Sequence, residues 1–319
     1  MKEFGGYFGL ELHQGPYAYH QASLALKSGR ASLHYILNYT KPSTVYVPYY
    51  TCDALLEPFA LTNTTYKFYE INELLEPVTL PVLGDNEYFI YINYFDLKRD
   101  FSNQLSARYG DKLIIDCTQA FFMKGNGQSW LFNSCRKFFG TPDGSYLYAP
   151  AGKTLPAVDE LNEHYLTEHL LKRFNGHTND GYADFTVNET YCDSTVLQMS
   201  KLSGYLLSHI DYQAVIEKRR SNYKTFQQAF GSINTINLDL ADGAVPMFYP
   251  FLTKKLIDKR SLHQQNIFVP TLWNDVLIRL ENEYAFEKDF TNRLIPLPID
   301  HRYQEEDIQL AITAISKLL

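Results

Sequence analysis

The sequence has no long hydrophobic run. Its longest apolar segment, residues 88–95, has only the length of a β-strand, whereas a helix that crosses a membrane needs about 20 apolar residues. Residues 1–15 contain no apolar stretch long enough for a signal peptide. We therefore expect a cytoplasmic protein that has no membrane contact.

Cysteine is scarce, and no two cysteines are close in the chain. Cys52, Cys117, Cys135 and Cys192 form no CxxC pair, which argues against a zinc site or a disulfide framework and fits reduced thiols in the cytoplasm. His164 and His169 are five residues apart, so they would lie on different faces of a helix. No metal site is expected.

An excess of basic residues is also missing. The chain has 29 Lys and Arg against 36 Asp and Glu, a net charge of −7, which argues against a protein dedicated to binding nucleic acid. It contains no GxGxxG, GxxxxGK[ST], HExxH or GxSxG motif. These absences argue against a dinucleotide fingerprint, a P-loop, a zinc protease and a serine hydrolase.

The composition that is present indicates a globular protein. The 319 residues are 45% hydrophobic and 20% charged, with 25 Tyr and 21 Phe. At roughly 150 residues per domain, this length predicts about two domains. The many aromatic residues favour extensive aromatic packing or a large interface.

Helical and strand patterns alternate in the first half of the chain. Patterns typical of helices cover residues 28–38, 52–60 and 103–109, and patterns typical of strands cover residues 44–50, 65–69, 88–94 and 112–116. The last two strands are apolar on both faces, as in a central parallel sheet. This order predicts an α/β domain with a mostly parallel sheet.

The second half has a different pattern, which predicts a smaller α+β domain. A long polar helix is expected within residues 200–230, ended by Gly231, followed by strands at residues 233–238, 246–252 and 267–270 and helices at residues 254–265 and 305–319. We place the boundary near residue 205, so that residues 1–205 form the large domain and residues 206–319 the small one.

Ser28-Gly29-Arg30 opens the first predicted helix. The free N–H groups and positive dipole end of such a turn suit a phosphate, and Arg30 adds charge. Taken alone, Ser28 is better explained as a simple helix cap.

Asp116 ends an apolar strand, at the edge where open α/β sheets bind ligands. A buried acid there needs a partner, and a protonated ring nitrogen is one candidate. The alternative is that Asp116 caps the following turn.

Lys137 follows 21 residues after Asp116, beside Arg136 and before a turn rich in Gly and Pro. A neighbouring like charge and burial both favour the neutral amine, which is a nucleophile toward carbonyls. The alternative is an exposed loop lysine.

Together these segments match the three anchors of pyridoxal phosphate. The cofactor needs a phosphate cradle at a helix N-terminus, a carboxylate on its ring nitrogen and a lysine for its aldehyde. The chain offers these groups in that order.

Several motifs resemble those of the DegT/StrS-type sugar aminotransferases, a branch of the fold type I pyridoxal phosphate enzymes. The family's Ser-Gly-Thr-x-Ala-Leu resembles residues 28–33, its Asp-x-x-Gln-Ala resembles residues 116–120, and its lysine preceded by a serine resembles Ser134 and Lys137. Residues 47–52, with a Pro and a nearby Thr, and the Pro-Leu-Pro segment within residues 295–300 are similar to further family segments. The resemblance runs through most of the chain.

The resemblance implies a role for each of these residues. Lys137 would hold the cofactor and move the proton, Asp116 would keep the ring nitrogen protonated, and Gln119 would contact the ring hydroxyl. Gly29, Arg30 and Ser134, beside Ser28, would bind the phosphate. Cys52 occupies the position over the ring face, where Tyr49 or Tyr50 would supply a flat contact.

The resemblance implies amino transfer from glutamate or a similar donor to a nucleotide-linked keto sugar. It also implies a homodimer. Arg30 replaces the family's Thr, and its Asn-x-Arg loop, which reaches the neighbouring subunit's cofactor, is not found, although Asn175 or Asn179 offers a substitute. Two alternatives stay open. One is another pyridoxal phosphate reaction, such as that of a lyase, dehydratase or decarboxylase, and the other is an inactive relative that acts as a binding subunit.

Overall fold

A computed structural model of the chain describes residues 6–177, 179–236, 238–281 and 283–319. Its centre is a seven-stranded sheet with the strand order β1-β7-β6-β5-β4-β2-β3. Strands β2 to β6 run parallel, and β7 is antiparallel to both of its neighbours. The expected α/β fold with a mostly parallel sheet is confirmed. The strands are β1 Leu24–Leu26, β2 Thr44–Pro48, β3 Thr65–Tyr69, β4 Glu87–Ile92, β5 Leu113–Cys117, β6 Trp130–Asn133 and β7 Ser145–Tyr148.

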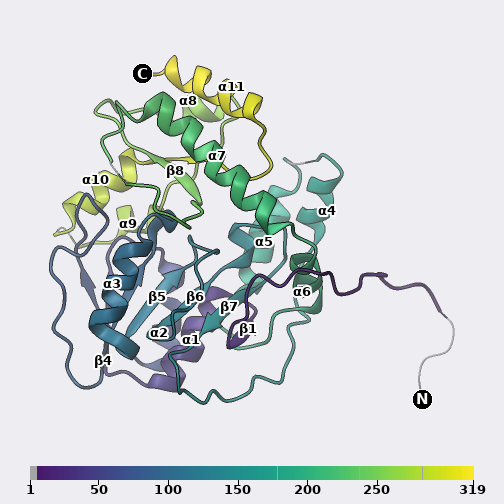
Figure 1. Ribbon diagram of the computed structural model, residues 1–319, viewed down its shortest axis with the longest axis vertical. Helices are drawn as coiled ribbons and strands as arrows, with labels where there is room; N and C mark the ends of the chain where they lie inside the picture. Colours follow the sequence, from purple (N-terminus) through teal and green to yellow (C-terminus); the bar gives the residue numbers. More distant parts are fainter. Residues whose placement is uncertain (1–5, 178, 237, 282) are drawn as a thin grey trace.

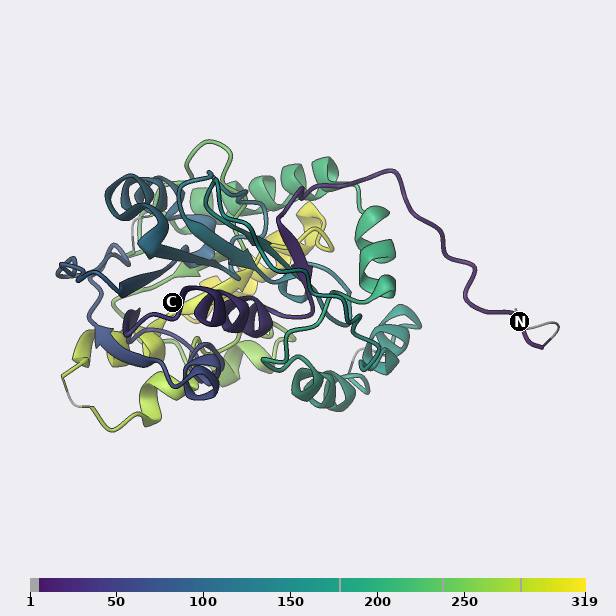
Figure 2. The ribbon, with the colours of Figure 1, turned by 90° about the horizontal axis from the view of Figure 1, so that it is seen from below.

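Both faces of this sheet are buried, because successive side chains of a strand point to opposite sides. Ile90 and Ile114 pack with the residues of α1 (Gly29–Thr40) and α2 (Glu57–Thr62). Phe89 and Ile115 belong to the core on the other face, which includes residues of α3 (Arg99–Tyr109). Figure 2 shows α1 and α2 below the sheet and α3 above it. The continuous apolar runs of the central strands follow from this double burial.

The rest of the chain is mostly helical and packs beside and above the carboxyl ends of the strands (Figure 1). A second, two-stranded sheet pairs β8 Phe248–Phe251 with β9 Ile295–Pro298. The helices are α4 Glu168–Phe174, α5 Tyr182–Tyr191, α6 Lys201–Ser208, α7 Tyr212–Phe230, α8 Lys259–His263, α9 Asn274–Ile278, α10 Ala285–Arg293 and α11 Glu305–Ser316. Single 3₁₀ turns are η1 Asp53–Leu55, η2 Tyr94–Asp96, η3 Gly110–Lys112 and η4 Cys135–Lys137.

The expectations for the first half hold more closely than those for the second. The helix expected within residues 200–230 is two helices, α6 and α7, because Asp211 caps a new helix by accepting from the N–H of Ala214. The helix expected over residues 254–265 is shortened to α8. The division of the chain at residue 205 stays a prediction, and that residue lies within α6.

Two expected strands of the second half are wrong. Residues 267–270 form no strand, nor do residues 233–236 and 238 of the other segment, whose residue 237 lies outside the described residues. The partner of β8 is instead β9, which contains two prolines. In the antiparallel register Pro250 lies opposite Pro296. Since neither can donate, these residues occupy a position without ladder hydrogen bonds, which is where such a pair tolerates proline.

Among the described residues, no helix combines the length and the apolar character that crossing a bilayer requires.

Candidate active site

One pocket opens at the carboxyl ends of the parallel strands, beside the N-terminus of α1. The hollow measures about 560 Å³, a volume that includes open solvent at its mouth. Seven of the nine residues predicted to form the site line it, and they are Ser28, Gly29, Arg30, Cys52, Asp116, Ser134 and Lys137. The fold therefore brings together side chains that are more than 100 residues apart in the chain.

The N-terminus of α1 forms one wall of the pocket. Ser28 caps the helix, since its Oγ accepts from the N–H of Ala31 at 2.9 Å and donates to the carbonyl of Asp193 at 2.7 Å. Within the described residues, the N–H groups of Gly29 and Arg30 have no protein acceptor. These two donors and the helix dipole make this wall suited to an anion.

Gly29 is required by close packing rather than by backbone conformation. A Cβ at this position would lie 3.2 Å from Cγ2 of Thr118 and 3.4 Å from the carbonyl oxygen of Asn133. The helix tip thus lies directly against the segments that follow β5 and β6. A Cβ at position 29 would require Thr118 or the helix tip to shift by a few tenths of an ångström.

Asp116 lies near the end of β5 and is only 4% exposed. Its Oδ1 accepts from the N–H of Thr118 at 2.7 Å. Burial raises the pKa of the Asp116 carboxyl, while the charge of Lys137 and the hydrogen bonds from Thr118 act in the opposite direction. A buried carboxylate at a pocket wall is suited to accept from a cationic N–H group of a ligand.

Lys137 ends η4, shortly after β6. Its side chain lines the same pocket but is exposed rather than buried, which is what the alternative of an exposed loop lysine predicted. Its charge also opposes the rise in pKa that burial causes at the Cys52 thiol, as it does at Asp116. In the part of the chain that the structure describes, no carboxylate lies within 4.0 Å of its Nζ. The amine is therefore available to a ligand in the pocket.

Arg136, the like-charged neighbour of Lys137, is held in an ion pair. Nη1 of Arg136 lies 2.6 Å from Oε1 of Glu189, and Nη2 of Arg30 donates to the carbonyl of Glu189 at 3.1 Å. Burial opposes the ionisation of Glu189, but Arg136, Arg30 and Lys137 together hold the pKa of this carboxyl below its usual value. Arg30 is also 3.1 Å from Glu57.

Sequence reasoning missed Glu189, which α5 brings to the pocket from a helical segment with no recognisable motif. The same region contributes Cys192. Asn175 and Asn179, which the sequence offered for the missing loop, do not line this pocket. Asn175 instead ends α4.

The structure does not bring Gln119 and Tyr50 to the pocket lining. Gln119 is buried, and its Oε1 accepts from the N–H of Phe95 at 3.0 Å. The ring of Tyr50 packs against Trp273 and Phe290. Tyr49, the other expected flat contact, stacks on Tyr284. Core packing has taken up both tyrosine rings, and Cys52 remains as the lining residue of this segment.

The described residues contain no group of three or more His, Cys, Asp or Glu side chains placed to hold a metal ion.

Comparison with known proteins relates the fold, but not the sequence, to a family. No protein-family model matches the chain, and no curated protein matches it in sequence. Many solved structures match in fold. The sugar aminotransferase CalS13 from Micromonospora echinospora has a TM-score of 0.64 and 12% identity, over 92% of this chain and 86% of the other.

Two further structures are similar to the same extent. The putative sugar aminotransferase Spr1654 from Streptococcus pneumoniae, in its PLP form, has a TM-score of 0.64 and 13% identity, over 94% of this chain and 89% of the other. A DegT DnrJ EryC1 StrS aminotransferase from Brucella abortus has a TM-score of 0.61 and 13% identity, over 92% and 85%. The chain has the fold of these enzymes, as the resemblance implied.

Proposed function

We propose that this chain is a pyridoxal phosphate-dependent aminotransferase. It would transfer an amino group from glutamate or a similar donor to a nucleotide-linked keto sugar, in amino-sugar or surface-polysaccharide biosynthesis. One observation carries the proposal. A buried carboxylate, an available amine and an anion-binding helix tip, contributed by Asp116, Lys137 and Gly29, line a single pocket. The shared fold with sugar aminotransferases supports the choice of reaction.

The residues present fit the cofactor. The N–H groups of Gly29 and Arg30, in a cradle that a Cβ would fill, suit its phosphate together with Ser134. Asp116 would accept from the ring N–H and so hold a proton at the ring nitrogen. Lys137 would hold the cofactor through its aldehyde group, and its amine would move a proton. The bound cofactor supplies the electron sink and carries the amino group.

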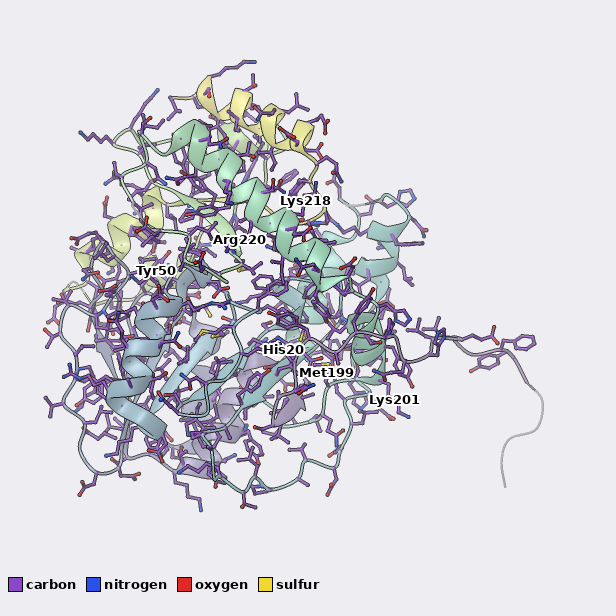
Figure 3. The ribbon with its side chains drawn as sticks, viewed as in Figure 1. His20, Tyr50, Met199, Lys201, Lys218 and Arg220 are labelled. Atoms are coloured by element: carbon purple, nitrogen blue, oxygen red, sulfur yellow. The ribbon has the colours of Figure 1, made fainter. Side chains whose placement is uncertain are left out.

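The first test is cofactor uptake. Purified protein mixed with pyridoxal phosphate is expected to turn yellow, and borohydride is expected to bleach the colour and fix the label on Lys137. Lys137→Ala should stay colourless, whereas Lys201→Ala, which replaces an exposed lysine of α6 (Figure 3), should keep the colour. A wild-type protein that takes up no cofactor contradicts the proposal.

The second test separates amino transfer from other reactions of the cofactor. Glutamate added to the yellow protein should remove the yellow absorbance and release 2-oxoglutarate in equal amount. Retention of the colour with glutamate and every other amino donor tried favours a lyase or dehydratase. An inactive relative is expected to have a site blocked by side chains, and the open pocket argues against this alternative.

We also propose that the chain works as a cytoplasmic homodimer. The pocket is open on one side, and four free thiols are compatible with a reducing compartment. Light scattering on the eluted protein should give twice the 36.9 kDa chain mass. A monomer that turns over substrate contradicts this part of the proposal.

A further inference from the structure

A second cavity adjoins the cofactor pocket at η4. It lies between η4, α4, α7 and the turn after β9, and it measures about 820 Å³, a volume that includes open solvent. Arg136 and Lys137 line both cavities. A molecule bound in the second cavity would therefore reach the amine of Lys137.

This cavity concentrates buried polar atoms that have no protein partner. The described residues contain eight such side-chain atoms, and four belong to residues that line this cavity. They are Oγ1 of Thr141, Nδ1 of His169, Nε of Arg219 and Nδ1 of His301. Folding a protein with unpaired buried polar groups is costly, so a cluster of them indicates a polar ligand or water.

The unpaired charges at the cavity are positive. Asp300 is the only carboxylate in the lining, and it holds Arg302 through two hydrogen bonds of 2.6 and 2.8 Å. Lys137, Arg173 and Arg219 also line the cavity, and the described residues place no carboxylate within 4.0 Å of their side-chain nitrogens.

Arg219 is the most informative of these cations because it is only 2% exposed. Its Nη1 donates to the carbonyls of Pro246 and Met247 at 3.3 and 3.2 Å, and the guanidinium lies 4.6 Å from the ring centre of Phe138. These contacts fix the plane of the group and leave Nε without an acceptor. A fixed, planar guanidinium with an unused donor suits an oxyanion.

The electrostatics agree with an anion site. Burial lowers the pKa of Arg219 to about 10, and Arg302 adds to this effect while Asp300 opposes it. Burial also lowers the pKa of His301, with a further contribution from Arg219. Burial likewise lowers the pKa of Arg173, with a contribution from Arg302. The positively charged forms of Arg219, His301 and Arg173 are thus disfavoured in this cavity, and a bound anion would stabilise all three.

We propose that this cavity binds an oxyanion group, a carboxylate or a phosphate, of the molecule that reacts at Lys137. Arg219, Arg173 and the two unpaired histidine nitrogens supply the donors. The assignment of this anion to a substrate rests on the proposed function, whereas binding of the anion itself does not.

Calorimetric titration of the full-length protein, loaded with pyridoxal phosphate, tests the proposal. The probes are inorganic phosphate and glutarate, a dicarboxylate that has no amine to transfer, both at constant ionic strength. At least one probe should bind to the wild type. Arg173→Gln and Arg219→Lys should each weaken that binding by roughly tenfold, the loss of one charged hydrogen bond.

Lys172→Gln is the matched control, because Lys172 is the neighbour of Arg173 on α4 but pairs with Asp184 and does not line the cavity. It should leave the affinity unchanged. If Arg173→Gln and Arg219→Lys weaken the binding of glutarate only, the cavity is assigned to a carboxylate. If they weaken the binding of phosphate only, it is assigned to a phosphate. Binding that is equal in wild type, Arg173→Gln and a folded Arg219→Lys overturns the proposal, as does the absence of binding by either probe.

Failure of the proposed function gives a different result. If the protein takes up no cofactor, the titration is repeated on the unloaded chain and on Arg30→Gln, which removes the charge at the first pocket. A probe that still binds to Arg30→Gln and is weakened by Arg173→Gln supports the anion site without the cofactor.

Discussion

Lys137 and Asp116 act on each other across the pocket. Burial raises the pKa of Asp116, and the positive charge of Lys137 opposes that rise. The two residues are separated by 21 positions in the chain. Asp116 lies near the end of β5 and Lys137 follows the neighbouring parallel strand β6, so both reach the same edge of the sheet. In the proposed reaction a ring nitrogen would be the second cationic partner of this carboxylate.

Asp116→Asn tests that role of the carboxylate. The amide has the same shape but no charge, so the ring nitrogen would lose the partner that keeps it protonated. We expect the variant to take up the cofactor and to lose about 100-fold or more in the rate of the glutamate half-reaction, the scale of general acid–base effects. Stopped-flow absorbance measures this rate.

Asp111→Asn provides the control, since Asp111 pairs with Lys153 at the surface. Its half-reaction should proceed at the wild-type rate. If Asp116→Asn reacts as fast as this control, the carboxylate has no role in the chemistry.

Gly29→Ala tests the anion-binding helix tip. The added Cβ would lie 3.2 Å from Cγ2 of Thr118, so α1 or the segment after β5 must move. Overpacking of this kind costs about 1–3 kcal/mol. We expect weaker cofactor binding, measured by titration of the absorbance, together with a lower free energy of unfolding.

A second substitution identifies the cause of that loss. Thr118→Ser removes Cγ2 but keeps the hydroxyl near Asp116. The double variant Gly29→Ala/Thr118→Ser should recover part of the cofactor affinity. If Gly29→Ala binds the cofactor as tightly as the wild type does, the N-terminus of α1 does not hold the phosphate.

Local patterns predicted the central strands of the sheet, because these strands are apolar on both faces and turns separate them in the sequence. Residues 65–69 match β3 without error, and the helix expected from Ser28 begins at Gly29 with Ser28 as its cap. β1, β6 and β7 were missed, because they have only three or four residues each. Their order in the sheet is a tertiary property.

The sequence placed a residue in the pocket lining where that residue sits near the end of a strand or the start of a helix, since the fold then fixes its position. Asp116, Lys137 and Gly29 belong to this class. Glu189 does not, because α5 reaches the pocket only through packing of the whole chain. Gln119 and Tyr50 were assigned by resemblance alone, and their side chains have other partners here.

A buried histidine next to the site makes the stability depend on pH. His20 is 8% exposed, with Nδ1 2.8 Å from the hydroxyl of Tyr148 and Nε2 3.2 Å from Nδ2 of Asn133, the residue before Ser134 (Figure 3). Burial lowers the pKa of His20 to about 3, and Lys124 contributes in the same direction.

The sign of the effect follows from the two states. The unfolded chain, with a histidine pKa of about 6.5, binds more protons than the folded chain between that pH and pH 3. The contribution of neutral His20 to stability is therefore complete above pH 6.5 and is lost as the pH falls. At pH 5 the loss is about 2 kcal/mol.

His20→Gln should remove this dependence, because glutamine keeps polar groups at the site but does not titrate. We expect urea unfolding to show a smaller drop in stability from pH 7 to pH 5 for His20→Gln than for the wild type, by about 2 kcal/mol. His209→Gln, at an exposed histidine, should keep the wild-type drop. Equal drops in all three proteins would mean that His20 is protonated in the folded chain at pH 5 without cost, and that the contact with Asn133 does not require the neutral ring.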